Sequence, residues 1–366
     1  MLDEVGEVDQ PGEVARVPAP PATPPQTTGP LRVQFASSLE AIRDEWDSLA
    51  LASRNVFATY EWISTWYRHF GASAQPITVT GRDGAGQLVA LVPLFVRRQG
   101  PLHVIRFAGS GPAGQLGPVS DPAHRQAGAV ALRGALDRSA VRWDVFLGTH
   151  LAVDEGWTHR IGGHLMRRQS SPVLRPGGDR WDRGLVQSRS TLLKEMRRTE
   201  QALAGEHALR YRLANDAQRL PQDLDRLFAL HRLRWRGESP FSSNEAFHRD
   251  FAAAAFARGW LRLRFLELDG DAVAASYTLR YAGRESGYQF AHDPRSPHAS
   301  LETLMLIRAV SKAFEEGVTE YAFLRGAEPH EHRLANVDAG LATVAIPHTA
   351  VGTVAVAVAR AAAHWR

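Results

Sequence analysis

The chain contains no cysteine among its 366 residues. This absence excludes disulfide bonds, thiolate zinc sites and a cysteine nucleophile. Lysine is nearly absent as well, because Lys194 and Lys312 are the only lysines among 43 basic residues. Together with abundant alanine and glycine, the excess of arginine favours a GC-rich bacterial coding sequence over selection for a function.

Long apolar runs are also missing. No stretch of about 18 apolar residues occurs, so no membrane-spanning helix is expected. Residues 1–9 carry four acidic and no basic side chains, which argues against a secretory signal. The apolar stretch 349–363 is interrupted by Gly352 and Arg360, and we interpret it as a docked terminal segment rather than a membrane-surface helix. We therefore expect a cytoplasmic protein, with peripheral attachment to the inner face of the membrane as the alternative.

The remaining composition is typical of a folded protein. Hydrophobic residues make up 44% of the chain and charged residues 22%, and the length allows two domains of roughly 100–200 residues each. Residues 1–30 hold seven of the 21 prolines and five acidic residues, so we expect a disordered, acidic, Pro-rich tail. The net charge is +4, yet residues 160–212 hold 12 basic and five acidic side chains. A solvated linker face is the favoured explanation of this excess, and a phosphate-attracting patch is the alternative.

Hydrophobic periodicity predicts the elements of the first half. A strand is expected at 31–35, then a helix opened by a capping box of Ser37 and Glu40, and a second helix over 59–70. Further elements are strands at 77–81, 88–96 and 103–108, a helix at 123–139 and a strand at 143–147.

The second half repeats this order. Its expected elements are a helix at 191–204, a strand at 209–213, helices at 221–236 and 242–258, strands at 260–268, 273–281 and 286–292, a helix at 301–316 and a strand at 319–324. The repeat predicts an α/β (α+β) fold of two tandem units, each a mixed, mostly antiparallel sheet flanked by helices. The expected boundaries place the units at 31–185 and 186–346, before an apolar C-terminal segment at 347–366.

One pattern resembles a nucleotide site without meeting its requirements. Residues 109–114 satisfy G-x-G-x-x-G, but a dinucleotide site needs a helix that begins inside the motif. Pro112 removes an N–H donor and Pro122 delays the next helix, so we expect a surface loop. No nucleophile elbow, Walker A loop or zinc-binding helix motif occurs. His330 and His332 lack a third ligand, so no metal is expected.

The junction between the strand 286–292 and the helix that begins at Leu301 is more informative. A helix N-terminus offers up to four unpaired amide N–H groups with partial positive charge, which suit a phosphate. Three antiparallel strands before this helix and one strand after it match the acyl-CoA-binding arrangement of GNAT-type acyltransferases. In that arrangement two strands splay apart, the exposed strand edge pairs with pantetheine, and the helix start takes the pyrophosphate.

Six segments carry a more specific resemblance: 57–66 (FATYEWISTW), 193–198 (LKEMRR), 231–235 (HRLRW), 268–275 (LDGDAVAA), 292–294 (HDP) and 324–329 (LRGAEP). Their order and spacing resemble the FemABX-related branch of the GNAT superfamily. The likeness is strongest to the CelD/BcsL-type acetyltransferases associated with bacterial exopolysaccharide or cellulose biosynthesis. It spans about residues 31–346 and implies two tandem GNAT-like domains with acetyl-CoA or another acyl-CoA as co-substrate.

The resemblance also implies a phosphate-binding loop before the helix at Leu301. The residues expected to bind CoA are Arg295, His298, Ala299, Ser300 and Leu301. His298 stands where the family's loop has glycine, which lets the backbone approach a phosphate closely. Glu331 stands where relatives carry a lysine, so a cation is exchanged for an anion.

Transfer requires a general base, because an amine or hydroxyl loses a proton as it attacks a thioester. The candidates are His292, Asp293 and Glu328. The structural alternatives are a turn started by Asp293 before Pro294, and pairing of Glu328 with Arg325.

Three further residues are candidates for acceptor binding: Tyr60, Trp62 and Arg325. Arg325 would clamp a phosphate or a carboxylate. For Trp62 the alternative is packing in the core.

The leading hypothesis is an acyltransferase that moves an acetyl or larger acyl group from CoA directly to an amine or sugar hydroxyl of a small-molecule or glycan-precursor acceptor. No covalent enzyme intermediate is expected without a cysteine or an activated serine motif. The alternatives are a non-catalytic GNAT-like binding protein and a Fem-like transferase that uses aminoacyl-tRNA. No DNA partner is expected, and tRNA ranks below the small-molecule acceptor.

Overall fold

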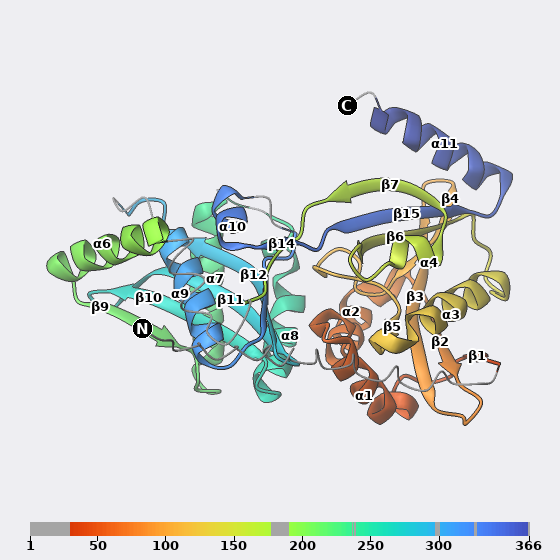
Figure 1. Ribbon diagram of the computed structural model, residues 1–366, viewed down its shortest axis with the longest axis horizontal. Coiled ribbons are helices and arrows are strands. Elements are labelled where there is room, and N and C mark those ends of the chain that lie inside the picture. Colours follow the sequence, from red (N-terminus) through yellow and green to blue (C-terminus); the bar gives the residue numbers. More distant parts are fainter. Residues whose placement is uncertain are drawn as a thin grey trace, which may run out of the picture.

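The computed structural model describes residues 30–176, 190–235, 237, 239–296, 301–325 and 328–364. Two sheets lie next to one another, each covered by helices (Figure 1). The expected Pro-rich tail falls, except for Pro30, outside the described residues.

Sheet A has eight strands in the order β1-β2-β3-β4-β6-β15-β7, with β5 paired to β3. These strands are β1 (Arg32–Phe35), β2 (Gln75–Arg82), β3 (Leu88–Gln99), β4 (Leu102–Phe107), β5 (Val119–Ser120), β6 (Val145–Ala152), β7 (His164–Gln169) and β15 (Leu341–Pro347). Its helices are η1 (Glu40–Ile42), α1 (Arg43–Ser53), η2 (Val56–Ala58), α2 (Tyr60–Phe70), η3 (Gly71–Ser73), η4 (Pro122–His124), α3 (Arg125–Asp137) and α4 (Trp157–Ile161).

Sheet B has seven strands in the order β14-β8-β13-β12-β11-β10-β9. These strands are β8 (Pro172–Leu174), β9 (Leu209–Leu213), β10 (Leu261–Leu268), β11 (Asp271–Tyr281), β12 (Arg284–His292), β13 (Glu320–Ala322) and β14 (Val337–Asp338). Its helices are α6 (Ser190–Glu206), α7 (Leu220–Arg234), η5 (Ser242–Asn244), α8 (Glu245–Ala257), α9 (Leu301–Glu315) and α10 (Pro329–Leu334). The fold is therefore α/β with two mixed, mostly antiparallel sheets, as the element order predicts.

Local signals explain most element boundaries. The Thr59 hydroxyl accepts a hydrogen bond from the Trp62 amide and starts α2, whose apolar side then faces the core. The predicted capping box of Ser37 with Glu40 is wrong. The chain enters α1 through the 3-10 turn η1, and the Ser38 hydroxyl accepts a hydrogen bond from the Ala41 amide instead.

The two sheets exchange strands. After β7 the chain passes to β8 in sheet B, and after β14 it returns to sheet A as β15, between β6 and β7. The two crossing segments are hydrogen-bonded to one another, because the Ser171 amide donates to the Asp338 carboxylate (2.8 Å) and the Ala339 amide donates to the Ser171 carbonyl (3.0 Å). β8, from the first predicted unit, therefore belongs to sheet B, and β15, from the end of the second predicted unit, belongs to sheet A.

A core of aromatic side chains joins the two sheets. Trp62 on α2 is fully buried, and its ring meets Phe247 and Phe251 of α8 and Tyr288 of β12 at centroid distances of 4.5–5.9 Å. Burial of large aromatic surfaces is the main stabilising contribution at such an interface. The two sheets therefore share one hydrophobic core.

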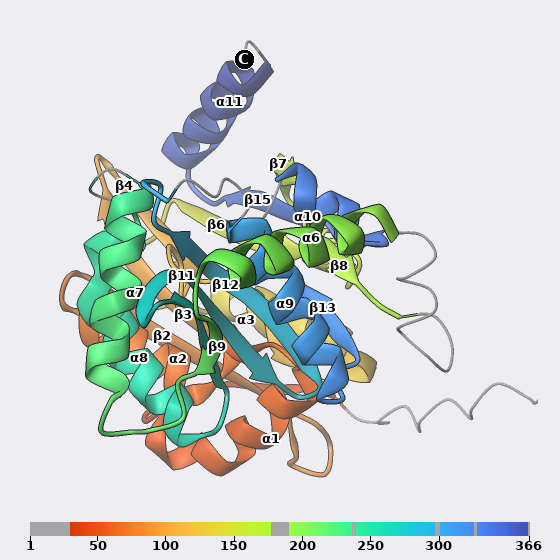
Figure 2. The same ribbon diagram turned by 90° about the vertical axis from the view of Figure 1, so that its left-hand side faces the viewer.

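The C-terminal helix α11 (Ala350–His364) extends away from the body of the molecule (Figure 2). One side, with Gly352 and Val356, is buried against sheet A. The C-terminal segment is therefore docked, as expected, only through this side of the helix. Within the part of the chain that the structure describes, no helix combines the length and the apolar character needed to cross a membrane.

Candidate functional site

Strands β12 and β13 separate part-way along their length. They pair in parallel from Arg284 with Glu320 to Ser286 with Ala322. Among the described residues, no β-sheet pairing joins the remainder of β12 (Gly287–His292) to β13. This free edge spans about 17 Å at the rise of a β-strand. It leads toward the N-terminus of α9, so the structure contains the opening that the sequence predicts.

The Tyr321 hydroxyl lies where the two strands separate. Tyr321 is fully buried, and its hydroxyl has no hydrogen-bond partner among the described residues. A Cβ atom on Gly287 would lie 3.0 Å from this oxygen, so glycine leaves room for the phenol. Burial raises the pKa of Tyr321, and the charges of Glu285 and Glu331 raise it further. The hydroxyl therefore stays protonated and is available as a donor, at a place where an unsatisfied buried donor is costly.

Glu331 lies near the opening, because its charge raises the pKa of Tyr321 and the charge of Glu302 raises the pKa of Glu331 itself. It is the third residue of α10, and its carboxylate accepts a hydrogen bond from the Glu328 amide (3.4 Å) in a capping box. Burial and the nearby charges of Glu328 and Glu302 raise the pKa of Glu331 to about 7. A carboxyl group with this pKa can accept and return a proton near neutral pH.

An ion-paired group holds the other end of the opening. The Nδ1 atom of His292 lies 3.1 Å from the Glu302 carboxylate, which also accepts two hydrogen bonds from the Arg234 guanidinium (2.6 and 2.8 Å). Burial raises the pKa of Glu302, but the contacts with His292 and Arg234 outweigh it and hold this pKa well below its usual range. The bidentate arginine fixes the carboxylate, and the carboxylate orients the imidazole.

Four of the seven remaining predicted acid–base and CoA-binding residues lie in the part of the chain that the structure describes. Asp293 accepts hydrogen bonds from the backbone and side chain of Arg295, so both take part in a local turn. Leu301 is fully buried as the first residue of α9. Glu328 is the N-cap of α10. His298, Ala299 and Ser300 lie outside the described residues, so their predicted contacts with CoA stay predictions.

The three predicted acceptor-binding residues do not form one cluster. The Tyr60 hydroxyl donates to Glu40 (2.5 Å), and the Arg43 guanidinium lies over the Tyr60 ring. Trp62 is fully buried in the shared core. Arg325 follows β13 and reaches the Gly111 carbonyl of the opposite unit (3.5 Å). Of the three, only Arg325 is both exposed and next to the strand opening.

The glycine-rich loop 109–114 is part of the interface between the units. The Tyr288 hydroxyl donates to the Pro112 carbonyl (2.9 Å). A Cβ atom on Gly114 would lie 2.7 Å from Leu324, so the loop and the end of β13 touch through glycine. The segment is a loop, as predicted, but the expected surface position is wrong, because Gly109, Ala113 and Gly114 are buried.

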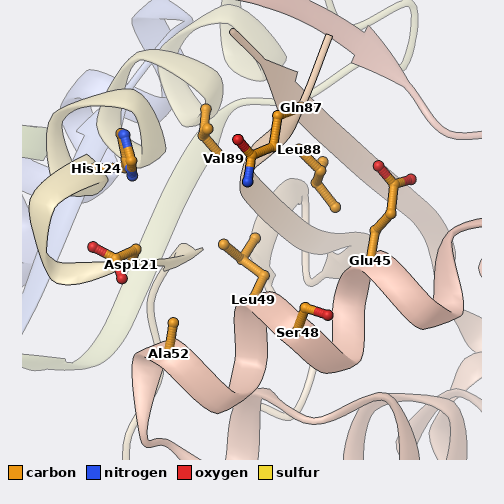
Figure 3. Close-up of a pocket in the computed structure, with 9 residues that line it drawn as sticks. All are labelled: Glu45, Ser48, Leu49, Ala52, Gln87, Leu88, Val89, Asp121 and His124. Carbon is orange, nitrogen blue, oxygen red and sulfur yellow. The ribbon is translucent and has the colours of Figure 1, made fainter. Parts of the chain in front are cut away.

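A cavity of about 330 Å³ lies in the first unit, between α1, the start of β3 and η4 (Figure 3). Its acidic side chains already have partners: Glu45 accepts two hydrogen bonds from Arg82, and Asp121 caps η4. This cavity lies on a different unit from the strand opening, and we assign it no role. Among the described residues, no group of three or more histidine and carboxylate side chains could hold a metal ion.

Comparisons with known proteins agree with this geometry. Residues 189–332, which include the strand opening, match the family model of the acetyltransferase (GNAT) domain. No curated protein matches the chain. The second unit is therefore a GNAT-type domain.

Solved structures show a likeness over most of the chain. The crystal structure of FemX superposes with a TM-score of 0.58 at 11% identity, covering 81% of this chain and 89% of FemX. L-PGS from Bacillus licheniformis gives 0.53 at 12% identity, covering 88% and 97%. The C-terminal domain of a protein assigned as a lysylphosphatidylglycerol synthetase from Agrobacterium fabrum gives 0.55 at 10% identity, covering 87% and 95%. These values establish that the chain shares the fold of these structures over most of its length.

Two residues beside the opening, Tyr321 and Glu331, are not predicted as site residues from the sequence. Tyr321 belongs only to the predicted strand 319–324, and Glu331 is only an exchanged charge, with no predicted role in proton transfer. Neither position has a distinguishing sequence pattern, because burial and the distance to Gly287 arise only from the folded chain. The Glu328–Glu331 capping spacing was the one available signal.

Proposed function

We propose that the protein is a GNAT-type N- or O-acyltransferase that uses acetyl-CoA or another acyl-CoA. The acceptor is an amine or a sugar hydroxyl, and the resemblance to CelD/BcsL-type enzymes supports a role in cell-surface polysaccharide biosynthesis in the cytoplasm. The observation that carries the proposal is the free edge of β12, which begins beside the unpartnered Tyr321 hydroxyl and leads to the start of α9.

The two ends of the free edge suit the two ends of acyl-CoA. The N-terminus of α9 and the preceding loop, with Arg295, His298, Ala299, Ser300 and Leu301, would bind the pyrophosphate. The unpaired backbone groups of Gly287–His292 would pair with the pantetheine amides, as a further strand would. The acyl group then lies at the Gly287 end, close to Tyr321 and Glu331.

The chemistry follows from this placement. The acceptor nitrogen or oxygen forms a bond to the acyl carbon as the bond from that carbon to sulfur breaks. Glu331 takes the proton that the acceptor loses, and the Tyr321 hydroxyl donates a hydrogen bond to the departing sulfur. Arg325, at the end of β13, would orient an anionic group on the acceptor.

Among the bases predicted from the sequence, His292 is the second candidate. Its pairing with Glu302 would orient it, but it lies at the α9 end of the free edge, and we infer that it supports the phosphate end of CoA. Asp293 and Glu328 have the turn and capping contacts described above, and we assign them lesser roles.

Calorimetric titration with acetyl-CoA and longer acyl-CoAs tests the proposal. We expect binding by the wild-type protein and by Tyr321→Phe, with transfer to an amine or sugar acceptor reduced at least tenfold in the variant. Gly287→Ala should weaken both binding and transfer, because the added methyl group meets the Tyr321 hydroxyl. Absence of heat with every acyl-CoA would remove the proposal.

The same titration separates the alternatives. The fold shared with FemX keeps a Fem-like transferase under consideration, and tRNA binding with a steep salt dependence, without acyl-CoA binding, would favour it. A binding protein without activity would gain CoA affinity only after His298→Gly.

A further inference from the structure

The outward side of α11 carries an apolar stripe. Val351, Val354 and Val358 are 58%, 63% and 63% exposed. Their spacing of three and four residues places them on one side of the helix. We refer to these three residues as the valine stripe. Large apolar side chains are normally scattered singly on a protein surface, so three in register indicate a contact surface.

The orientation of α11 is fixed from the opposite side. A Cβ atom on Gly352 would collide with the Asp144 carbonyl oxygen, and Val356 packs against Val145 and Ala345 of sheet A. The Thr349 hydroxyl donates to the Asp144 carboxylate (2.8 Å). The valine stripe is therefore held away from the sheet.

The chain segments that flank α11 carry basic and no acidic side chains, and the Asp144 carboxylate beside Thr349 is buried. The sequence contains no acidic residue at 339–366 or at 156–176. Arg360 of α11 lies against His164 of β7 (3.3 Å). Arg167 and Arg168 of β7 are exposed as well, and they directly follow Met166, which packs with Val356 of α11.

A basic rim around an apolar helix side matches the surface of an anionic lipid bilayer. Apolar side chains enter the boundary between headgroups and acyl chains, while arginines stay at the level of the lipid phosphates. A second copy of the chain fits less well. Three valines and the alanines between them supply far less than the roughly 800 Å² that each partner buries in a standard interface. In a dimer formed through this side, the positively charged arginines of the two copies would also lie close together and repel one another.

We propose that α11, together with the basic residues of β7, binds the protein to anionic lipid bilayers. The surface belongs to sheet A, whereas the strand opening belongs to sheet B. The proposal therefore does not depend on the acyl-transfer chemistry. It assigns to α11 a reversible attachment without a membrane-spanning segment.

Co-sedimentation of the full chain with vesicles tests the proposal. One set of vesicles contains equal parts of phosphatidylglycerol and phosphatidylcholine, and the other contains phosphatidylcholine alone. We expect binding to the anionic vesicles and at least tenfold weaker binding to the neutral ones. Raising the salt from about 0.05 M to about 0.5 M should weaken the anionic binding, because it screens the arginines.

Substitutions in α11 and β7 test whether these elements bind the vesicles. Val351→Gln combined with Val354→Gln and Val358→Gln should reduce anionic-vesicle binding at least tenfold, and Arg168→Gln with Arg360→Gln should reduce it as well. The matched control changes two exposed apolar residues on other helices, Leu51→Gln and Val130→Gln, and should bind like the wild type. Circular dichroism confirms that each variant is folded.

Three results would overturn the proposal. They are no binding of the wild type to anionic vesicles, equal binding by the triple valine variant, and a dimer in light scattering that the triple variant loses. The third result would assign the stripe to a second copy. Acyl-CoA titration of the same variants should be unchanged, so failure of the lipid proposal is distinguishable from failure of the transferase proposal.

Discussion

At the scale of single residues, Glu331 gives the proposed transferase its pH dependence. Its pKa is raised to about 7, and a general base acts only when it is deprotonated. We therefore expect kcat/KM to rise with pH and to level off above about pH 7. Glu331→Gln should lower kcat/KM by about 10²–10⁴-fold and remove this rise. Initial rates between pH 5.5 and 9 measure both effects, and a titration unchanged in Glu331→Gln would transfer the role of base to His292.

The raised pKa of Glu331 also affects the stability of the fold. Activity should increase with pH, whereas stability should decrease. A carboxyl whose folded pKa exceeds its unfolded value stabilises the fold below the unfolded pKa, and that contribution is lost as the pH rises through about 7. Since glutamine keeps an acceptor for the Glu328 amide, Glu331→Gln should have a higher Tm than the wild type at pH 8.5. This advantage should be absent at pH 4. Equal Tm differences at both pH values would contradict the assignment.

Loss of the Glu285 side chain should cost much stability. Glu285 is fully buried and accepts hydrogen bonds from Arg264 (2.9 Å), Arg280 (2.7 Å) and Thr278 (2.6 Å). Glu285→Ala leaves the buried Arg264 without its carboxylate partner, whereas Arg280 keeps its pair with Glu316 (2.7 Å). We therefore expect a loss of about 3–5 kcal/mol in the free energy of unfolding, measured by urea titration. As a control, Glu315→Ala breaks an exposed pair with Lys312 and should cost no more than about 1 kcal/mol.

At the scale of elements, Gly352 determines whether α11 stays attached to sheet A. A methyl group there meets the Asp144 carbonyl oxygen, so Gly352→Ala should displace the helix. We expect faster hydrogen exchange over 350–362 and a lower Tm. Gly205→Ala, on α6, is the matched control, because nothing lies within 4 Å of an added Cβ atom and alanine favours a helix. It should leave stability equal or higher by up to about 1 kcal/mol.

The sequence predicts the regular elements well, for reasons visible in particular segments. Alternation in β10 and β11 and the apolar side of α9 depend on local patterns, and each lies where the pattern indicates. β7, β8, β14 and β15 were not predicted. β8 and β14 are short, β15 is mostly apolar, and β7 (HLMRRQ) does not alternate between apolar and polar residues. Their partners lie up to about half the chain away, so local periodicity carries no information about them.

The candidate site likewise has one part that the sequence predicts and another part that it does not. The position of the opening follows from the order of strands and from the helix start at Leu301, both of which are readable from the sequence. Tyr321 and Glu331 could not be found in this way, because their importance comes from burial and from the charges around them.

At the scale of the whole molecule, the exchange of strands makes the two sheets dependent on one another. Residues 31–185 lack β15, which pairs with both β6 and β7. A fragment of residues 31–185 should therefore fail to give the dispersed NMR spectrum of a folded protein. The full chain should unfold in urea in one transition, with tryptophan fluorescence and far-UV circular dichroism coinciding. Two separate transitions would show that each sheet is stable alone.

The return of β15 also has a consequence for synthesis. During translation, β6 and β7 emerge from the ribosome long before β15, the strand that lies between them. The first sheet stays incomplete, with two bare strand edges, until residue 347 has emerged. During that interval the bare edges offer a place where a neighbouring polypeptide can pair.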